Sequence, residues 1–244
     1  MDQIMAIAGG TWRRVLRMRV VYFLILCVWV LIASALNYDV LSLQHHEQFM
    51  IDISLLLNTV AAILVAISLT FEIPRELREG VASTLLAKPL GRTSYLIGKL
   101  LGTIVIGMVI TALIGLGFFV IFKLGVDKPL VNSMILSHLF VMASVVPMCG
   151  IALFFSVIMP ELLAPIATFV VIWLASSYSY ALNGATGLYG GIVPDLDLYN
   201  LRAAAIYSTS IAWEHFLLVF LWGVVFCCFT TSFSSLIFGT RDLK

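Results

Sequence analysis

Charge is scarce in this sequence. Its 244 residues include 14 lysines and arginines and 13 aspartates and glutamates, so charged residues are 11% of the chain and hydrophobic residues 61%. The mean hydropathy is +1.08. This low charged fraction excludes an ordinary soluble domain and is typical of a protein that crosses the membrane several times. The net charge of +1 gives no indication of a nucleic-acid partner.

Cysteine is also rare, and its four residues all lie in apolar segments: Cys27, Cys149, Cys227 and Cys228. Their spacing fits neither a disulfide framework nor a zinc site, so they are interpreted as small packing residues. No metal site is predicted. The histidines fall at or near the outer side of the topology derived below: His45, His46, His138 and His215. We interpret them as polar residues at the headgroup level, with an outward metal site as the alternative.

Ionisable residues are missing from the middle of the apolar segments. Asp52, Glu161 and Glu214 come nearest, and each lies within a few residues of a segment end. An intramembrane enzyme needs ionisable residues within its spans. A secondary transporter needs charge at mid-membrane and usually has an internal repeat. The sequence therefore argues against both classes.

Six apolar segments are each long enough to cross a bilayer. They are residues 20–36, 53–71, 95–122, 133–158, 162–182 and 213–238. If the N-terminus is cytoplasmic, 11 of the 14 basic residues lie inside and only Lys123, Lys128 and Arg202 lie outside. This bias places both termini in the cytoplasm. We therefore expect an all-α membrane protein, with residues 1–244 forming one transmembrane domain of six helices.

Two further segments have distinctive compositions. Residues 1–19 mix basic and apolar residues at roughly helical spacing, which predicts either an interfacial helix or simple basic anchors for the first span. Residues 183–212 are interrupted by glycine and proline, which predicts short helices that re-enter from the outer face before the last span.

Residues 72–99 form a charged island between the second and third spans. They include eight charged residues: Glu72, Arg75, Glu76, Arg78, Glu79, Lys88, Arg92 and Lys99. The order of residues predicts a charged helix end, a break at Gly80, a short amphipathic helix, a stop at Pro89, and re-entry into the bilayer around Lys99.

From Arg75 to Lys99 this island resembles a loop of the membrane-spanning subunits of ABC-2 type transporters. The shared pattern is Arg-Glu-x-x-Glu-Gly-Thr-x-x-x-Leu-Leu-x-x-Pro-x-x-Arg-x-x-x-x-x-Gly-Lys, from which Val81 departs. The resemblance implies the type V architecture, with re-entrant helices before the last span. It also implies the permease subunit of an ATP-driven exporter. Two permease copies, identical or sister chains, would form the translocation path on two separate ABC ATPase subunits.

We predict that residues 81–88 are the coupling helix, with Leu85 and Leu86 as apolar anchors in a groove of the ATPase. Charged side chains at the end of the second span are expected to pair at i,i+3 and i,i+4 and to stiffen it. The residues assigned to ATPase coupling are Glu72, Arg75, Glu76, Arg78, Glu79, Gly80, Leu85, Leu86, Pro89, Arg92 and Lys99. An ordinary solvated loop is the alternative.

No nucleotide-binding motif is found in the chain. Gly91 and Gly98 are separated by six residues where a P-loop has four, and Leu100 follows Lys99 where serine or threonine would bind magnesium. The subunit is therefore not expected to be an enzyme or to hold a cofactor, and ATP and magnesium are expected in the partner ATPase.

A stripe of small, mildly polar residues follows one face of the second span, and a similar stripe follows the fifth. The polar members are Ser54, Asn58, Ser68, Thr168 and Ser179. The resemblance implies that these two spans line the path, whereas close helix packing is the other interpretation. Gly98 and Gly102 form a GxxxG pair, which indicates close packing without naming the partner helix.

The predicted function is thus an exporter permease in the cell membrane, by inference a bacterial inner membrane, with lipid as its surroundings. The substrate is not defined, although a path with few charges suits an amphiphilic molecule. A membrane anchor or mechanotransmitter for an ABC ATPase is the alternative, because it would share the same coupling loop.

Overall fold

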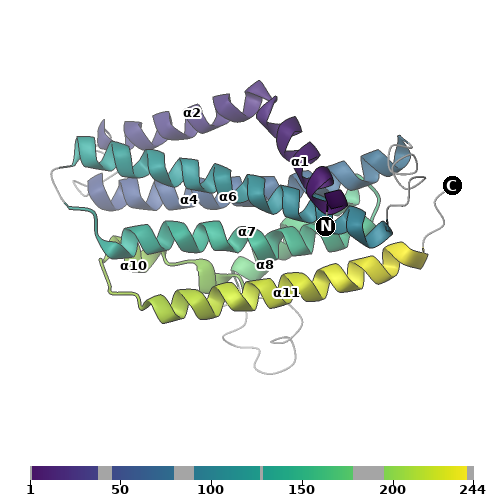
Figure 1. Ribbon diagram of the computed structural model, residues 1–244. Helices are drawn as coiled ribbons and strands as arrows, with labels where there is room; N and C mark the ends of the chain where they lie inside the picture. The colour runs from purple at the N-terminus through teal and green to yellow at the C-terminus, as the bar shows by residue number, and fades with distance from the viewer. Residues whose placement is uncertain (1, 38–45, 80–90, 127–128, 178–194, 241–244) are drawn as a thin grey trace.

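The computed structural model describes residues 2–37, 46–79, 91–126, 129–177 and 195–240. Every regular element in these ranges is helical (Figure 1). In chain order they are α1 (Asp2–Leu16), α2 (Arg19–Ser34), the short 3-10 helix η1 (Ala35–Asn37), α4 (His46–Arg78), α6 (Arg92–Gly125), α7 (Asn132–Ile158), α8 (Leu163–Ser176), the 3-10 helix η2 (Asp197–Tyr199), α10 (Arg202–Ile206) and α11 (Trp213–Thr240).

Four of these helices, α4, α6, α7 and α11, are long and apolar enough to cross a membrane. The number rises to five if α1 and α2, which meet at a bend of 64°, count as one broken span. The predicted 20–36 and 162–182 spans are therefore not supported as independent spans by length: α2 has 16 residues and α8 has 14. The second of these predictions also extends into residues outside the described ranges.

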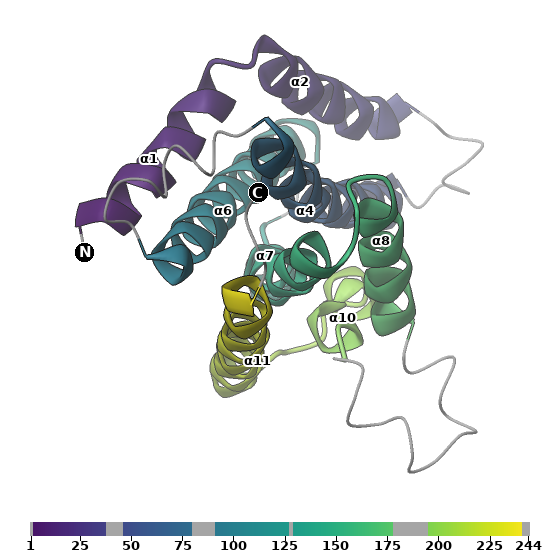
Figure 2. The ribbon, with the colours of Figure 1, turned by 90° about the vertical axis from the view of Figure 1, so that its right-hand side faces the viewer.

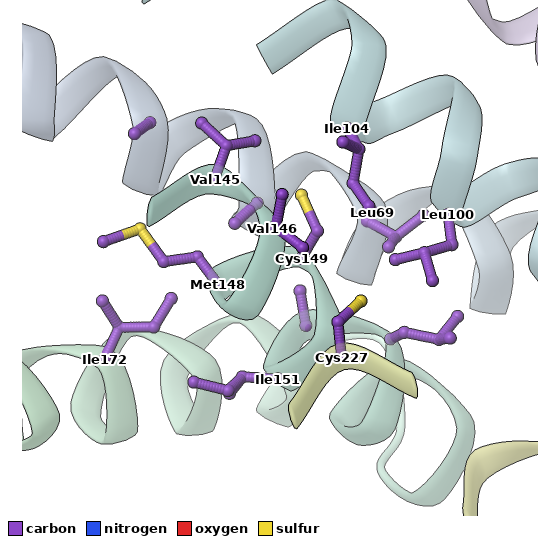
Figure 3. Packing of buried hydrophobic residues seen from close by; sticks show 14 of the residues in the cluster. Leu69, Leu100, Ile104, Val145, Val146, Met148, Cys149, Ile151, Ile172 and Cys227 are labelled. Atoms are coloured by element: carbon purple, nitrogen blue, oxygen red, sulfur yellow. The ribbon is translucent and has the colours of Figure 1, made fainter. Parts of the chain in front are cut away.

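Helix α7 is the centre of the bundle. Of its most apolar window 78% is buried, against 22% for α11, and Figure 2 shows α4, α6, α8 and α11 arranged around it. Figure 3 shows its side chains meeting those of each neighbour. The labelled residues are Leu69, Leu100, Ile104, Val145, Val146, Met148, Cys149, Ile151, Ile172 and Cys227.

The segment between α8 and α11 packs into the bundle through two short helices. Because α8 rises only about 21 Å and α7 about 40 Å, η2 and α10 occupy the end of α7 that α8 does not reach (Figure 1). The Tyr199 hydroxyl donates a hydrogen bond to the Val219 carbonyl over 2.9 Å. Nη2 of Arg202 lies 2.6 Å from Oδ1 of Asp52 on α4. Short helices in residues 183–212 were predicted, and these two are present.

His138 is buried inside the bundle. Its side chain is 5% exposed, with Nδ1 2.9 Å from the Met134 carbonyl oxygen and its ring stacked 4.8 Å from that of Phe118. The central position of α7 accounts for this burial. The predicted headgroup level concerns depth in the bilayer and stays a prediction.

The GxxxG pair of α6 packs against α1. A Cβ on Gly98 would lie 2.8 Å from Cβ of Ile7, and one on Gly102 would lie 3.1 Å from the carbonyl oxygen of Ala8. The two glycines therefore allow the backbones of α1 and α6 to approach closely. The helix that packs against the GxxxG pair is therefore α1, which the sequence alone did not identify. The same contact places α1 beside the charged end of α4.

Candidate functional site

Side chains from three helices form a charge cluster, defined as Arg14 of α1, Glu72 and Glu76 of α4, and Tyr95 and Lys99 of α6. Glu72 and Glu76 are four residues apart and so share one face of α4. Lys99 Nζ lies 2.6 Å from Glu72 Oε1 and 2.7 Å from Glu76 Oε1. Arg14 contacts the same two oxygens at 2.9 and 3.1 Å.

Most of this cluster is buried. The side chains of Lys99, Glu76 and Glu72 are 5%, 6% and 15% exposed, whereas that of Arg14 is 51% exposed. The hydroxyl of Tyr95 donates to Glu76 Oε2 over 2.7 Å, so both oxygens of this carboxylate are bonded. Two cations balance two anions, as buried charges require. The cluster ties α1, α4 and α6 together at one end of the bundle.

The pairing predicted within the end of α4 is only partly right. Arg75 and Glu79 form the expected i,i+4 pair at 2.8 Å. Arg78 instead reaches Glu161, in the turn between α7 and α8, at 2.7 Å. Glu72 and Glu76 pair with α1 and α6. The difference arises because these carboxylates face neighbouring helices, so the end of α4 is braced from outside.

The start of α6 is attached to the end of α11. Arg92 donates to the carbonyl oxygen of Gly239 over 2.9 Å, a favourable place for a cation because the C-terminal carbonyls of a helix carry partial negative charge. The hydroxyls of Thr93 and Ser235 are 2.8 Å apart. The ring of Tyr95 stacks on that of Phe238 at 6.3 Å. Both helix ends that flank residues 80–90 are therefore joined to other helices.

The structure brings together the predicted coupling residues Glu72, Glu76 and Lys99. The predicted coupling residues at the helix ends have the contacts given above: Arg75, Arg78, Glu79 and Arg92. The remaining four lie outside the described residues: Gly80, Leu85, Leu86 and Pro89. Three contributors to these contacts were missed by sequence reasoning: Arg14, Tyr95 and Glu161. A signal for Arg14 existed, because Ile7, Thr11 and Arg14 follow one face of a helix and Gly98 and Gly102 offer a surface for it.

The polar residues of the two stripes predicted to line the path lie in different environments. Ser54 and Asn58 are fully buried, whereas Ser68 is exposed on α4. Within the part of the chain that the structure describes, both side-chain amide atoms of Asn58 and the hydroxyl of Thr168 on α8 have no hydrogen-bond partner. Ser179 lies outside the described residues. Ser54 donates to the Ile51 carbonyl over 2.8 Å, whereas Asn58 and Thr168 are buried without such a bond in the described ranges.

The ion pairs and hydrogen bonds of the site attach the ends of α4 and α6 to α1, α11 and the α7–α8 turn. In a comparison with known families, the model of the multidrug efflux system permease Rv1217c, C-terminal domain, matches residues 32–229. No curated protein matches the chain. The matched range includes the whole charged island and excludes α1 with Arg14.

Proposed function

The chain belongs to the family of the multidrug efflux system permease Rv1217c, C-terminal domain, and from this premise we propose that it is the permease subunit of an ATP-driven ABC exporter of the ABC-2 type. Two copies, or one copy and a sister permease, form the translocation path. A separate ABC ATPase binds ATP and magnesium and docks on residues 81–88 as the coupling helix. The protein works in the cell membrane, and a bacterial inner membrane fits the separate ATPase.

One observation carries the coupling proposal: the two helix ends that flank residues 80–90 are fixed to the rest of the bundle. The end of α4 is held by Lys99 and Arg14, and by the Arg78–Glu161 pair. The start of α6 is held by Arg92 against α11. A displacement of either flanking helix end is therefore expected to reach the elements that this end contacts: α1, α6, the α7–α8 turn and α11.

The buried polar atoms without partners support a path between α4 and α8. These two helices are in contact, and Asn58 and Thr168 are both fully buried. Leaving such a group unpaired costs about 1–3 kcal/mol, a cost that is recovered if the groups meet water or cargo in another state. We therefore assign Asn58 and Thr168 to the surface that opens when ATP binds, and we expect an amphiphilic cargo.

Replacing Asn58 with leucine tests this assignment. Removing an unpaired buried amide should raise the free energy of unfolding by about 1–2 kcal/mol. It should also abolish stimulation of ATP hydrolysis by an amphiphilic dye in vesicles that contain the permease and its ATPase. Thr111→Val is the control, because the Thr111 hydroxyl is bonded to the Gly107 carbonyl at 2.8 Å and lies on α6; stimulation should persist.

Two outcomes would contradict the path assignment. One is stimulation that is unchanged in Asn58→Leu. The other is loss of stimulation in both variants, which would reflect general damage. If hydrolysis by the native complex responds to no amphiphile at all, the mechanotransmitter becomes the better description, because it uses the ATPase without moving a substrate.

A further inference from the structure

An apolar groove lies between α2 and the pair formed by α4 and α6. After the bend that follows α1, helix α2 runs beside α4 and α6 (Figure 2). The groove lies on this side of the bundle. Its volume is about 350 Å³, within the range of about 300–1,000 Å³ usual for small-molecule sites. The polar residues that line it are Thr11, Ser68, Glu72 and Thr103.

The groove is open to the surroundings between α2 and α4. Leu24 of α2 and Leu64 of α4 both line it, and they are 53% and 58% exposed. The lining residues of α4 run from Leu57 to Glu72, about 22 Å at 1.5 Å per residue. One leaflet of hydrocarbon is about 15 Å thick, half of a core of about 30 Å. The groove is therefore long enough for an extended acyl chain from a single leaflet.

Two exposed arginines flank the residue that lines this groove at the α1–α2 bend. Met18 lines it at the bend between α1 and α2, and Arg17 and Arg19 on either side of Met18 are both exposed. Within the described ranges neither arginine forms an ion pair, whereas Arg14 and Lys99 are neutralised by Glu72 and Glu76. Basic side chains next to an apolar groove favour an anionic headgroup.

We propose that this groove binds an anionic phospholipid. One acyl chain lies along α4 between Leu57 and Glu72, and the phosphate contacts Arg17 and Arg19. The lipid fills the space beneath α2 and supports the bend that connects it to α1. Because α1 carries Arg14 into the charge cluster, the bound lipid also steadies one of the two cations that hold the end of α4.

The test is native mass spectrometry of the full chain in detergent, titrated with dioleoylphosphatidylglycerol or dioleoylphosphatidylcholine. We expect the anionic lipid to bind roughly 30-fold more tightly, since each arginine near the phosphate contributes about fivefold. Arg17→Gln should weaken phosphatidylglycerol about fivefold. Lys123→Gln, which removes an exposed charge near the other end of α6, should leave binding unchanged.

A tryptophan that fills the groove gives an independent arm of the test. Leu64→Trp should abolish lipid binding, and Leu116→Trp is its matched control, because Leu116 is 59% exposed on α6 but does not line the groove. If Leu64→Trp does not fold, Leu24→Trp blocks the groove from the opposite wall. Equal binding of the two lipids, or native binding by the blocked variants, overturns the proposal. Loss of a dimer from a blocked variant, without loss of lipid, would assign the groove to a second copy and would equally overturn it.

Discussion

Replacing Lys99 with methionine is expected to lower the free energy of unfolding by about 3–5 kcal/mol, the usual cost of breaking a buried ion pair by removing one partner. Lys99 Nζ contacts Glu72 and Glu76 at 2.6 and 2.7 Å, and its side chain is 5% exposed. Methionine preserves the length of the side chain but leaves two carboxylates with Arg14, which is half exposed, as the only cation of the described cluster. The free energy of the native state rises because those charges cannot be solvated.

The measurement is thermal unfolding in detergent followed by a thiol-reactive dye in a Cys228→Ser background, because Cys228 is exposed whereas Cys149 is buried and becomes reactive on unfolding. Arg75→Met is the control: it removes an arginine from an exposed i,i+4 pair with Glu79 and should change the melting temperature little. Adding Glu76→Gln to Lys99→Met should restore part of the stability by removing one uncompensated charge. A Lys99→Met variant that melts like the native chain would show that the cluster is not a structural attachment.

The second large effect is expected from Gly98→Ala. A single methyl group at this position would lie 2.8 Å from Cβ of Ile7 and 3.2 Å from the carbonyl oxygen of Ile4, so α1 must move away from α6. Overpacking of this kind typically costs about 1–3 kcal/mol. The loss should be visible in the same thiol-reactivity melt, even though alanine is intrinsically the better helix former.

Gly10→Ala provides a control of opposite sign. No atom lies within 4 Å of the Cβ that it would add, and Gly10 is in the middle of α1, so alanine should stabilise the helix by up to about 1 kcal/mol. Gly98→Ala should also be non-additive with Arg14→Gln, because displacing α1 already removes Arg14 from Glu72 and Glu76. Equal effects of the two alanine substitutions would contradict the close α1–α6 contact.

The sequence predicted the long helices well, because hydropathy is a local property that each segment carries by itself. Four of the six predicted spans coincide with α4, α6, α7 and α11 to within a few residues at most ends. The largest discrepancy is α4, which runs from His46 to Arg78 rather than over 53–71. Apolar residues mark the part that suits the bilayer, whereas the charged residues from Glu72 onward continue the helix.

The site was only partly predictable because its contacts join distant parts of the chain. The local pair Arg75–Glu79 could be read from spacing, but the position of Lys99 between Glu72 and Glu76 depends on how α4 packs against α6. Residues 1–19 were interpreted as an interfacial helix or as basic anchors, because the face with Ile7, Thr11 and Arg14 and the Gly98–Gly102 pair do not identify each other as partners from sequence alone. The unpaired amide of Asn58 is likewise a property of the packed state.

Copurification tests the central claim that residues 81–88 dock the ATPase. The chain is coexpressed with its candidate ATPase subunit as native protein, as Leu85→Glu, and as Leu124→Glu, which places the same charge at an 83% exposed position near the other end of α6. We expect the native chain and Leu124→Glu to retain the ATPase and Leu85→Glu to lose it. Retention by Leu85→Glu at the native level would contradict the claim.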